Sequence, residues 1–139
     1  VWGPGWRKTR LRDYCRGELL AHEDYVRAYA GASVAINLLC GGEHDVMEGP
    51  GCNRRLFEVA AIGVPQIVED VPDLHRHFSE GSEILAFRTS GDLRSLTAEA
   101  LQDRAWAEQV AAGGRQRALS EHTYMHRMIE LLHHARVGA

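Results

Sequence analysis

Apolar residues come in two kinds of run that alternate along this chain. The nearly all-apolar run at residues 33–39 is typical of a strand in a sheet that is covered on both faces, and the shorter segments 66–69 and 84–87 are predicted to be buried strands. Strands that alternate with helices predict an α/β fold: a Rossmann-like, doubly wound parallel sheet with a helical C-terminal third that packs on a sheet face. Apolar spacings of three or four residues predict helices at 22–30, 54–62, within 71–78, and at 90–101, 103–120 and 124–136.

Cap and breaker residues set the ends of these helices. Asn53 and Asp103 stand where helix N-caps are expected, and Gly63 stands where a helix ends. The pair Gly113 and Gly114 falls inside the predicted 103–120 helix, where we expect a kink.

The composition is that of one globular domain with its own core. The chain has 139 residues, of which 45% are hydrophobic, and a formal net charge of −3. This charge lacks the basic excess of proteins that bind nucleic acid. Because the sequence starts at Val1, in what reads as a strand already under way, we expect residues 1–139 to be a fragment of a longer protein.

Cysteine use and hydropathy favour a cytoplasmic protein. Cys15, Cys40 and Cys52 are odd in number and widely spaced, which indicates neither a disulfide framework nor a zinc site. No apolar run reaches the length of a transmembrane segment, and no signal peptide is visible. Contact with a membrane surface remains compatible with the sequence.

The stretch at residues 53–70 carries the strongest chemical signal. With Asn53 as N-cap, Arg54 and Arg55 are the first helical residues, where the helix macrodipole disfavours positive charge. The same arrangement suits an anion, because free N–H groups, the dipole and two guanidinium groups converge. It therefore predicts a site for a phosphate or diphosphate.

Glu58 interrupts the apolar side of this helix and has two interpretations. It lies four residues after Arg54, so the pair can form a surface ion pair worth about 0.3 kcal/mol in this order. Alternatively, its carboxylate accepts hydrogen bonds from a pair of ligand hydroxyls, as an acidic residue does with ribose in dinucleotide folds. The residues alone leave both interpretations open.

Other polar groups give weaker signals, and none identifies a catalytic residue. His75 and His77 form an HxH pair without an evident third ligand, so no metal is expected. His44 and Asp45 could form an acid–base pair, although loop polarity alone explains them. The first glycines are followed by the basic residues Arg7, Lys8, Arg10 and Arg12, which form either a solvated loop or a phosphate-facing one.

The order of these motifs resembles a known enzyme family. The segment NRRLFEVAAIGVP at 53–65 is similar to the region around the second glutamate of the EX7E motif in group 1 glycosyltransferases of GT-B fold. An N-x-R-x-F-E block before a glycine turn resembles most closely the CgeB-like, spore-maturation branch. The resemblance covers nearly the whole chain, which would be one half of a GT-B fold, the C-terminal domain.

The resemblance implies a nucleoside-diphosphate sugar as donor and no obligatory cofactor. It implies that Glu58 holds the ribose hydroxyls, with Arg54 and Asn53 near the diphosphate or the sugar. It also implies that a loop of Gly3 and Gly5 approaches the phosphates, and that Arg16 and Gly17 lie near the base.

This sequence departs from the EX7E motif at one position, and two functions therefore stay open. The first EX7E acid falls at Pro50, which cannot serve, and Glu48 is out of register. The first function is donor binding in a glycosyltransferase that would be active only with its N-terminal GT-B domain. The alternative is a non-catalytic Rossmann-like module that binds a nucleotide or a partner in spore or envelope assembly.

Overall fold

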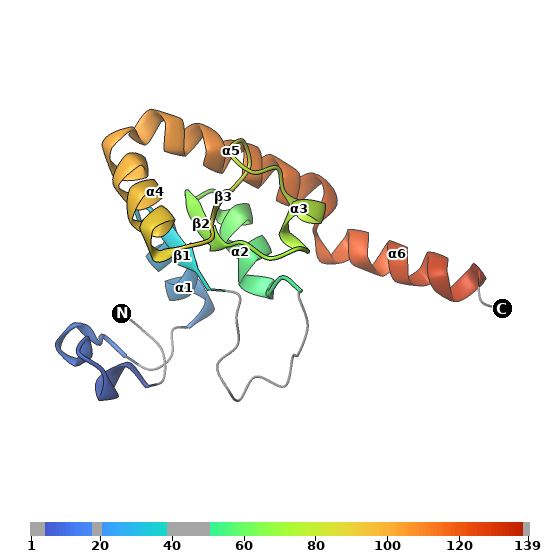
Figure 1. Ribbon diagram of the computed structural model, residues 1–139. Helices are drawn as coiled ribbons and strands as arrows, with labels where there is room; N and C mark the ends of the chain where they lie inside the picture. Colours follow the sequence, from blue (N-terminus) through green and yellow to red (C-terminus); the bar gives the residue numbers. More distant parts are fainter. Residues whose placement is uncertain (1–4, 18–20, 39–50, 138–139) are drawn as a thin grey trace. The chain divides into compact units, whose positions relative to one another are not determined.

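The computed structural model describes residues 5–17, 21–38 and 51–137, in two compact units at 1–31 and 32–139 (Figure 1). The first unit contains two short 3₁₀ helices and one α-helix. These elements are η1 (Trp6–Lys8), η2 (Arg12–Tyr14) and α1 (His22–Ala30). Gly5 precedes η1 with φ of 88°, a left-handed backbone conformation that favours glycine. The predicted helix at 22–30 is confirmed with the same bounds.

The second unit carries the sheet and its helices. In chain order its elements are β1 (Ala35–Asn37), α2 (Arg54–Ile62), β2 (Gln66–Glu69), α3 (Leu74–His77), β3 (Leu85–Phe87), α4 (Ser90–Gln102), α5 (Arg104–Glu121) and α6 (Tyr124–Val137). In the described residues the sheet has the order β1-β2-β3, and both pairs are parallel. The predicted α/β arrangement with a parallel sheet is therefore confirmed, and it is consistent with a Rossmann-like fold.

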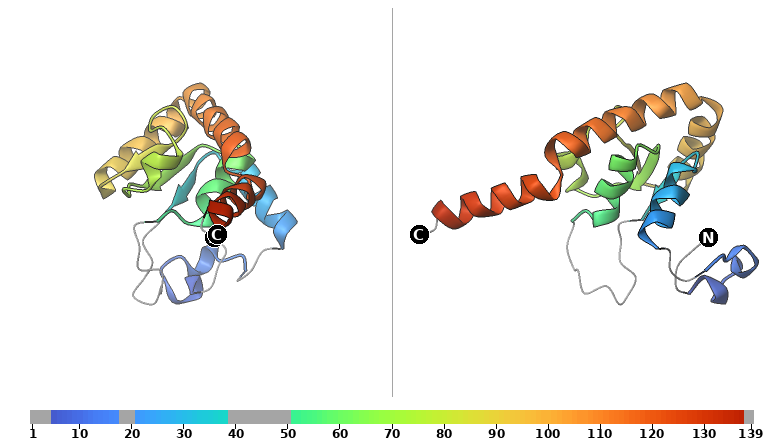
Figure 2. Two further views of the ribbon diagram at one scale, coloured as in Figure 1. Left: turned by 90° about the vertical axis from the view of Figure 1, so that its right-hand side faces the viewer. Right: turned by 180° about the vertical axis from the view of Figure 1, so that it is seen from behind.

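Side chains of β2 and β3 alternate between two separate apolar clusters. Ile67 packs with residues of α4 and α5, whereas Val68 packs with residues of α2 and α3. Because successive strand residues point to opposite faces, both faces of the sheet are covered (Figures 1 and 2). The edge strand β1 of the described sheet differs, since Ile36 is 48% exposed, so the prediction of a strand covered on both faces is wrong for β1.

Residues at the ends of α2 and α5 explain why these helices form where they do. Asn53 accepts a hydrogen bond from Leu56 N at 3.1 Å and caps α2, which ends at Gly63 with φ of 86°. Asp103 caps α5 in the same way through Trp106 N at 3.0 Å. These three predicted helix ends are confirmed.

The glycine pair of α5 serves close packing. α5 continues through Gly113 and Gly114, and both face the turn that precedes β3. A Cβ atom on Gly114 would lie 2.3 Å from the carbonyl oxygen of Glu83, so only glycine allows this approach.

The helical last third packs on the sheet only in part. α4 and α5 contribute buried residues to the core, as predicted. Six large apolar side chains of α6 are exposed, so the prediction of packing on a sheet face is wrong for this helix. They are Tyr124, Met125, Met128, Ile129, Leu131 and Leu132.

Candidate functional site

The candidate site lies where the strands end at their carboxyl termini. α2 and α3 both begin near this edge, because each lies in the connection that leaves one parallel strand and leads to the next. In open parallel sheets this edge is where ligands bind. The predicted anion site at the start of α2 is therefore at the expected edge.

Buried amide groups fix the start of α2 to this edge. Asn37, which is 1% exposed at the end of β1, exchanges hydrogen bonds of 3.1 and 3.2 Å with the side chain of Asn53. It also donates to Gln66 Oε1 at 3.2 Å, and Gln66 donates to the carbonyl of Leu56 at 3.1 Å. Asn53 thus acts as a scaffold residue in the described structure. The sequence predicted its capping role but gave no signal for its amide partners.

Arg54 and Glu58 form the ion pair that was one of the two interpretations. Arg54 Nε lies 2.9 Å from Glu58 Oε1, on adjacent turns of α2. The Arg54 side chain is 75% exposed and that of Glu58 35% exposed. Exposed pairs of this kind contribute about 0.3–0.5 kcal/mol, so a ligand can rearrange this pair at little cost. The pair does not exclude the second interpretation, and a donor-binding role for either residue stays a prediction.

The other predicted binding residues lie in the first unit or outside the described residues. Gly5, Arg16 and Gly17 belong to the first unit, in which Arg16 is exposed and Gly17 half-buried. Gly3 lies outside the described residues, as do Glu48 and Pro50. A contact of these residues with one nucleotide stays a prediction.

A cluster that the sequence analysis missed joins the residue before α2 to α3. The Sγ atom of Cys52, a carboxylate oxygen of Asp73 and a ring nitrogen of His77 lie within 4.8 Å of one another. Asp73 Oδ2 accepts from Cys52 N and lies 3.3 Å from both that nitrogen and His77 Nε2. The helical i,i+4 spacing of Asp73 and His77 was the available signal.

Two pKa values in this cluster are displaced. Burial, and after it the negative charge of Asp73, raise the pKa of the Cys52 thiol to about 11. Burial alone would raise the pKa of Asp73, but the hydrogen bond from Cys52 N and the contact with His77 outweigh it and lower that pKa below 3.8. His75 does not join this cluster, since its Nε2 instead lies 2.7 Å from Asp70 Oδ1.

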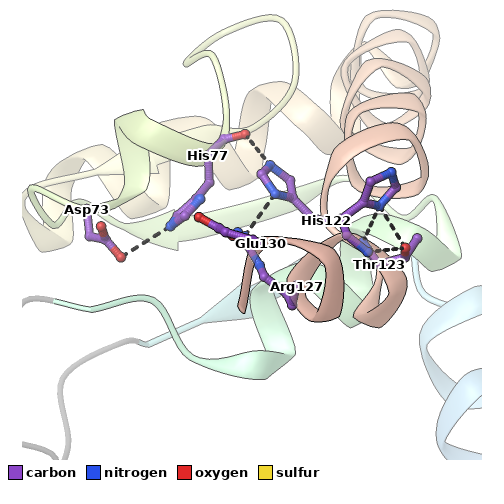
Figure 3. A network of polar contacts seen from close by, with 7 residues as sticks. Asp73, His77, His122, Thr123, Arg127 and Glu130 are labelled. Carbon is purple, nitrogen blue, oxygen red and sulfur yellow. Dashed lines mark hydrogen bonds and ion pairs between the residues drawn. The ribbon is translucent and has the colours of Figure 1, made fainter. Parts of the chain in front are cut away.

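His122 connects this cluster to the start of α6 (Figure 3). Its Nε2 lies 3.0 Å from the carbonyl oxygen of His77, so Nε2 carries the proton, and Nδ1 accepts from Arg127 at 3.0 Å. Burial lowers the pKa of His122; the His77 carbonyl opposes this shift, and the charge of Arg127 adds to it. The ring also packs against Phe57 of α2. His122 is therefore a neutral contact between α2, α3 and α6.

A second charged network stands at the ends of β2 and β3. Arg88 Nε lies 2.8 Å from Asp70 Oδ2, and its two terminal nitrogens pair with the carboxylate of Glu80 at 3.2 and 3.0 Å. This network joins residues that directly follow the two strands, so it stiffens the carboxyl edge beside α3.

Comparison with known proteins identifies the family of this chain. Among the described residues, no helix has both the length and the apolar character that crossing a bilayer requires. A search of curated proteins finds no match. The family model described as glycosyl transferase-like matches residues 1–133, which is nearly the whole chain. This match agrees with the parallel α/β sheet of the second unit. The chain therefore belongs to the glycosyl transferase-like family.

Proposed function

We propose that this chain is the donor-binding, C-terminal domain of a GT-B glycosyltransferase and binds a nucleoside-diphosphate sugar. The observation that carries the proposal is the family match over residues 1–133. The position of Arg54 and Glu58, on one exposed side of α2 at the carboxyl edge of the sheet, supports it. The CgeB-like branch is proposed on the N-x-R-x-F-E block alone.

The diphosphate would bind at the first turn of α2. Backbone N–H groups of a helix's first turn have no acceptor within the helix, and the macrodipole favours negative charge there. Arg54 uses Nε for its ion pair, so a phosphate would take the other edge of its guanidinium group. Arg55 is also exposed in this turn and adds positive charge.

The ribose would bind at Glu58, one turn further along α2. A carboxylate can accept two hydrogen bonds from neighbouring hydroxyls. Its ion pair with Arg54 orients the Glu58 carboxylate without burying it. The two residues would thus bind adjacent parts of one nucleoside diphosphate, phosphates at the helix start and sugar hydroxyls beyond.

In a two-domain enzyme this arrangement would assist glycosyl transfer electrostatically. Negative charge develops on the departing diphosphate, and prearranged N–H groups with Arg54 would stabilise it. The acceptor would bind to the missing N-terminal domain, so this chain alone should bind donor weakly and turn over none. Turnover of a sugar nucleotide by purified residues 1–139 would contradict this assignment.

The test titrates UDP, GDP and dTDP sugars into the wild type, Glu58→Ala and Arg54→Ala. We expect Glu58→Ala to weaken UDP and GDP sugars at least tenfold and dTDP sugars less, because deoxyribose lacks the 2′-hydroxyl. Arg54→Ala should weaken all three. Glu108→Ala, which removes the exposed Arg104–Glu108 pair of α5, is the matched control and should change nothing. Equal binding by wild type and Glu58→Ala would remove Glu58 from the site.

A non-catalytic nucleotide- or partner-binding module is the second candidate function. Pro50 favours it, because it stands where the first EX7E acid of the resembled family falls. A parent gene that encodes an N-terminal Rossmann-like half would favour the enzyme, and nucleotide binding without any such half would favour the module.

A further inference from the structure

Three different metal-ligand types converge beside α2 in the described part of the chain. Cys52 immediately precedes the N-cap of α2, whereas Asp73 and His77 stand at the two ends of α3. Their Sγ, carboxylate oxygen and ring nitrogen lie within 4.8 Å of one another, and all three residues are half-buried. No step of the proposed donor binding uses this cluster, so its chemistry needs its own explanation.

The spacing of two of these three atoms matches ligands that share one ion. Zn²⁺ binds sulfur at about 2.3 Å and nitrogen or oxygen at about 2.0–2.2 Å, which separates tetrahedral ligand atoms by about 3.3–3.6 Å. Asp73 Oδ2 and His77 Nε2 already lie 3.3 Å apart. A charged hydrogen bond between them would be shorter, about 2.7–2.9 Å. A movement of the Cys52 sulfur by about 1 Å toward the other two ligand atoms would bring all three to the spacing expected around one ion.

The donor set also selects the class of metal. Mg²⁺ and Ca²⁺ take oxygen ligands, whereas one thiolate, one imidazole and one carboxylate suit a borderline cation such as Zn²⁺. A thiolate and a carboxylate would together neutralise its two charges. Arg76 approaches Asp73 from the other carboxylate oxygen, Oδ1, at 3.8 Å, so Oδ2 faces the cluster without competition from this arginine.

We propose that Cys52, Asp73 and His77 form a Zn²⁺ site with three protein ligands and a fourth position for water. The hydrogen bond from Cys52 N to Asp73 would remain and orient the carboxylate. His77 is held by T-shaped contacts with the rings of Phe57 and His122, at centroid distances of 5.1 and 5.2 Å. The ion would tie the residue before α2 to α3 and hold the start of α2 in place.

The test uses the whole chain in a background with Cys15→Ser and Cys40→Ser, so that Cys52 is its only thiol. Co²⁺ replaces Zn²⁺ as a spectroscopic probe, and Mg²⁺ serves as the hard-cation control. We expect one equivalent of Co²⁺ to give a thiolate-to-metal charge-transfer band and tetrahedral visible bands, which one equivalent of Zn²⁺ abolishes. Mg²⁺ should not compete.

Ligand variants then assign the site. Cys52→Ser and His77→Gln should each weaken Zn²⁺ binding by at least about tenfold. His75→Gln, on the same helix but paired with Asp70, is the matched control and should bind like the background. A Co²⁺ complex without a thiolate band overturns the proposal even if a variant fails to fold. So does Zn²⁺ binding that Cys52→Ser and His77→Gln leave within threefold of the background.

Discussion

Replacement of Gly114 by alanine separates two physical effects with opposite signs. Helix propensity alone predicts stabilisation of about 1 kcal/mol, because glycine is the poorer residue inside a helix. The packing of α5 predicts the reverse. An added Cβ atom would lie 2.3 Å from the carbonyl oxygen of Glu83, and the same change at Gly113 would place one 2.4 Å from the oxygen of Ser82.

The clash is the larger of the two effects. Both distances are about 1 Å shorter than an ordinary van der Waals contact. The atoms in the way are backbone oxygens in the turn before β3, so no side-chain rotation relieves the overlap. Overpacking costs about 1–3 kcal/mol, and an overlap this deep with fixed backbone atoms takes the upper part of that range, about 2–3 kcal/mol. After the propensity gain of about 1 kcal/mol, this leaves a net loss of about 1–2 kcal/mol for Gly114→Ala.

Urea unfolding followed by circular dichroism measures this difference. A loss of about 1–2 kcal/mol lowers the midpoint by about 0.5–1 M at ordinary m-values. Gly91→Ala in α4 is the control, because its Cβ atom would meet only Thr89 Oγ1 at 3.4 Å. We expect the control midpoint to stay the same or rise. A Gly114→Ala midpoint at or above that of the wild type would refute close approach as the reason for glycine in α5.

Two further predictions concern buried and capping polar groups. Asn37→Ala removes a hydrogen-bond partner from the side-chain amides of both Asn53 and Gln66, so we expect the free energy of unfolding in urea to fall by about 1–3 kcal/mol. The control Gln102→Ala changes an exposed residue and should unfold near the wild-type midpoint. Equal midpoints for Asn37→Ala and the wild type would contradict a stabilising role of this network. Hydrogen bonds from Arg88 N and Thr89 lower the pKa of Asp92 below 3.8. Its stabilisation is therefore present above the unfolded-state pKa of about 3.9 and is lost as pH falls through the lower folded value. In a plot of unfolding free energy against pH, Asp92→Asn should therefore lose less stability in acid than the wild type. Equal slopes for the two proteins below about pH 4 would contradict this role of Asp92.

Much of the fold could be predicted because its signals are local. The bounds of the helix at 54–62 and of the strand at 66–69 follow from one N-cap, one left-handed glycine and one apolar run, all in adjacent sequence. The exposure of Ile36 could not be predicted, since it depends on β1 being the edge strand of the described sheet. Likewise, the apolar pattern of α6 indicates a helix but not whether that helix packs on the sheet.

The site was predictable to the extent that it lies on one helix. Arg54 and Glu58 are four residues apart, so their contact on α2 follows from helical geometry. The approach of Cys52 to Asp73 and His77 depends on how α3 turns after β2, across 21 residues or more of sequence. No spacing rule covers such a contact, which is why the widely spaced cysteines indicated no metal site.

Neutral groups position the start of α2, whereas its charged groups remain on the surface at the carboxyl edge of the sheet. This separation affects what that edge can bind. Buried amides of Asn37, Asn53 and Gln66 hold the helix in position, and none of them carries charge. The charged residues Arg54 and Glu58 interact with each other on the surface, where their pair contributes little to stability. Removing either charge should therefore leave the fold intact, so a loss of nucleotide binding in such a variant would report on the site itself. A helix start held by neutral groups is free to direct its own positive charge toward an anionic ligand.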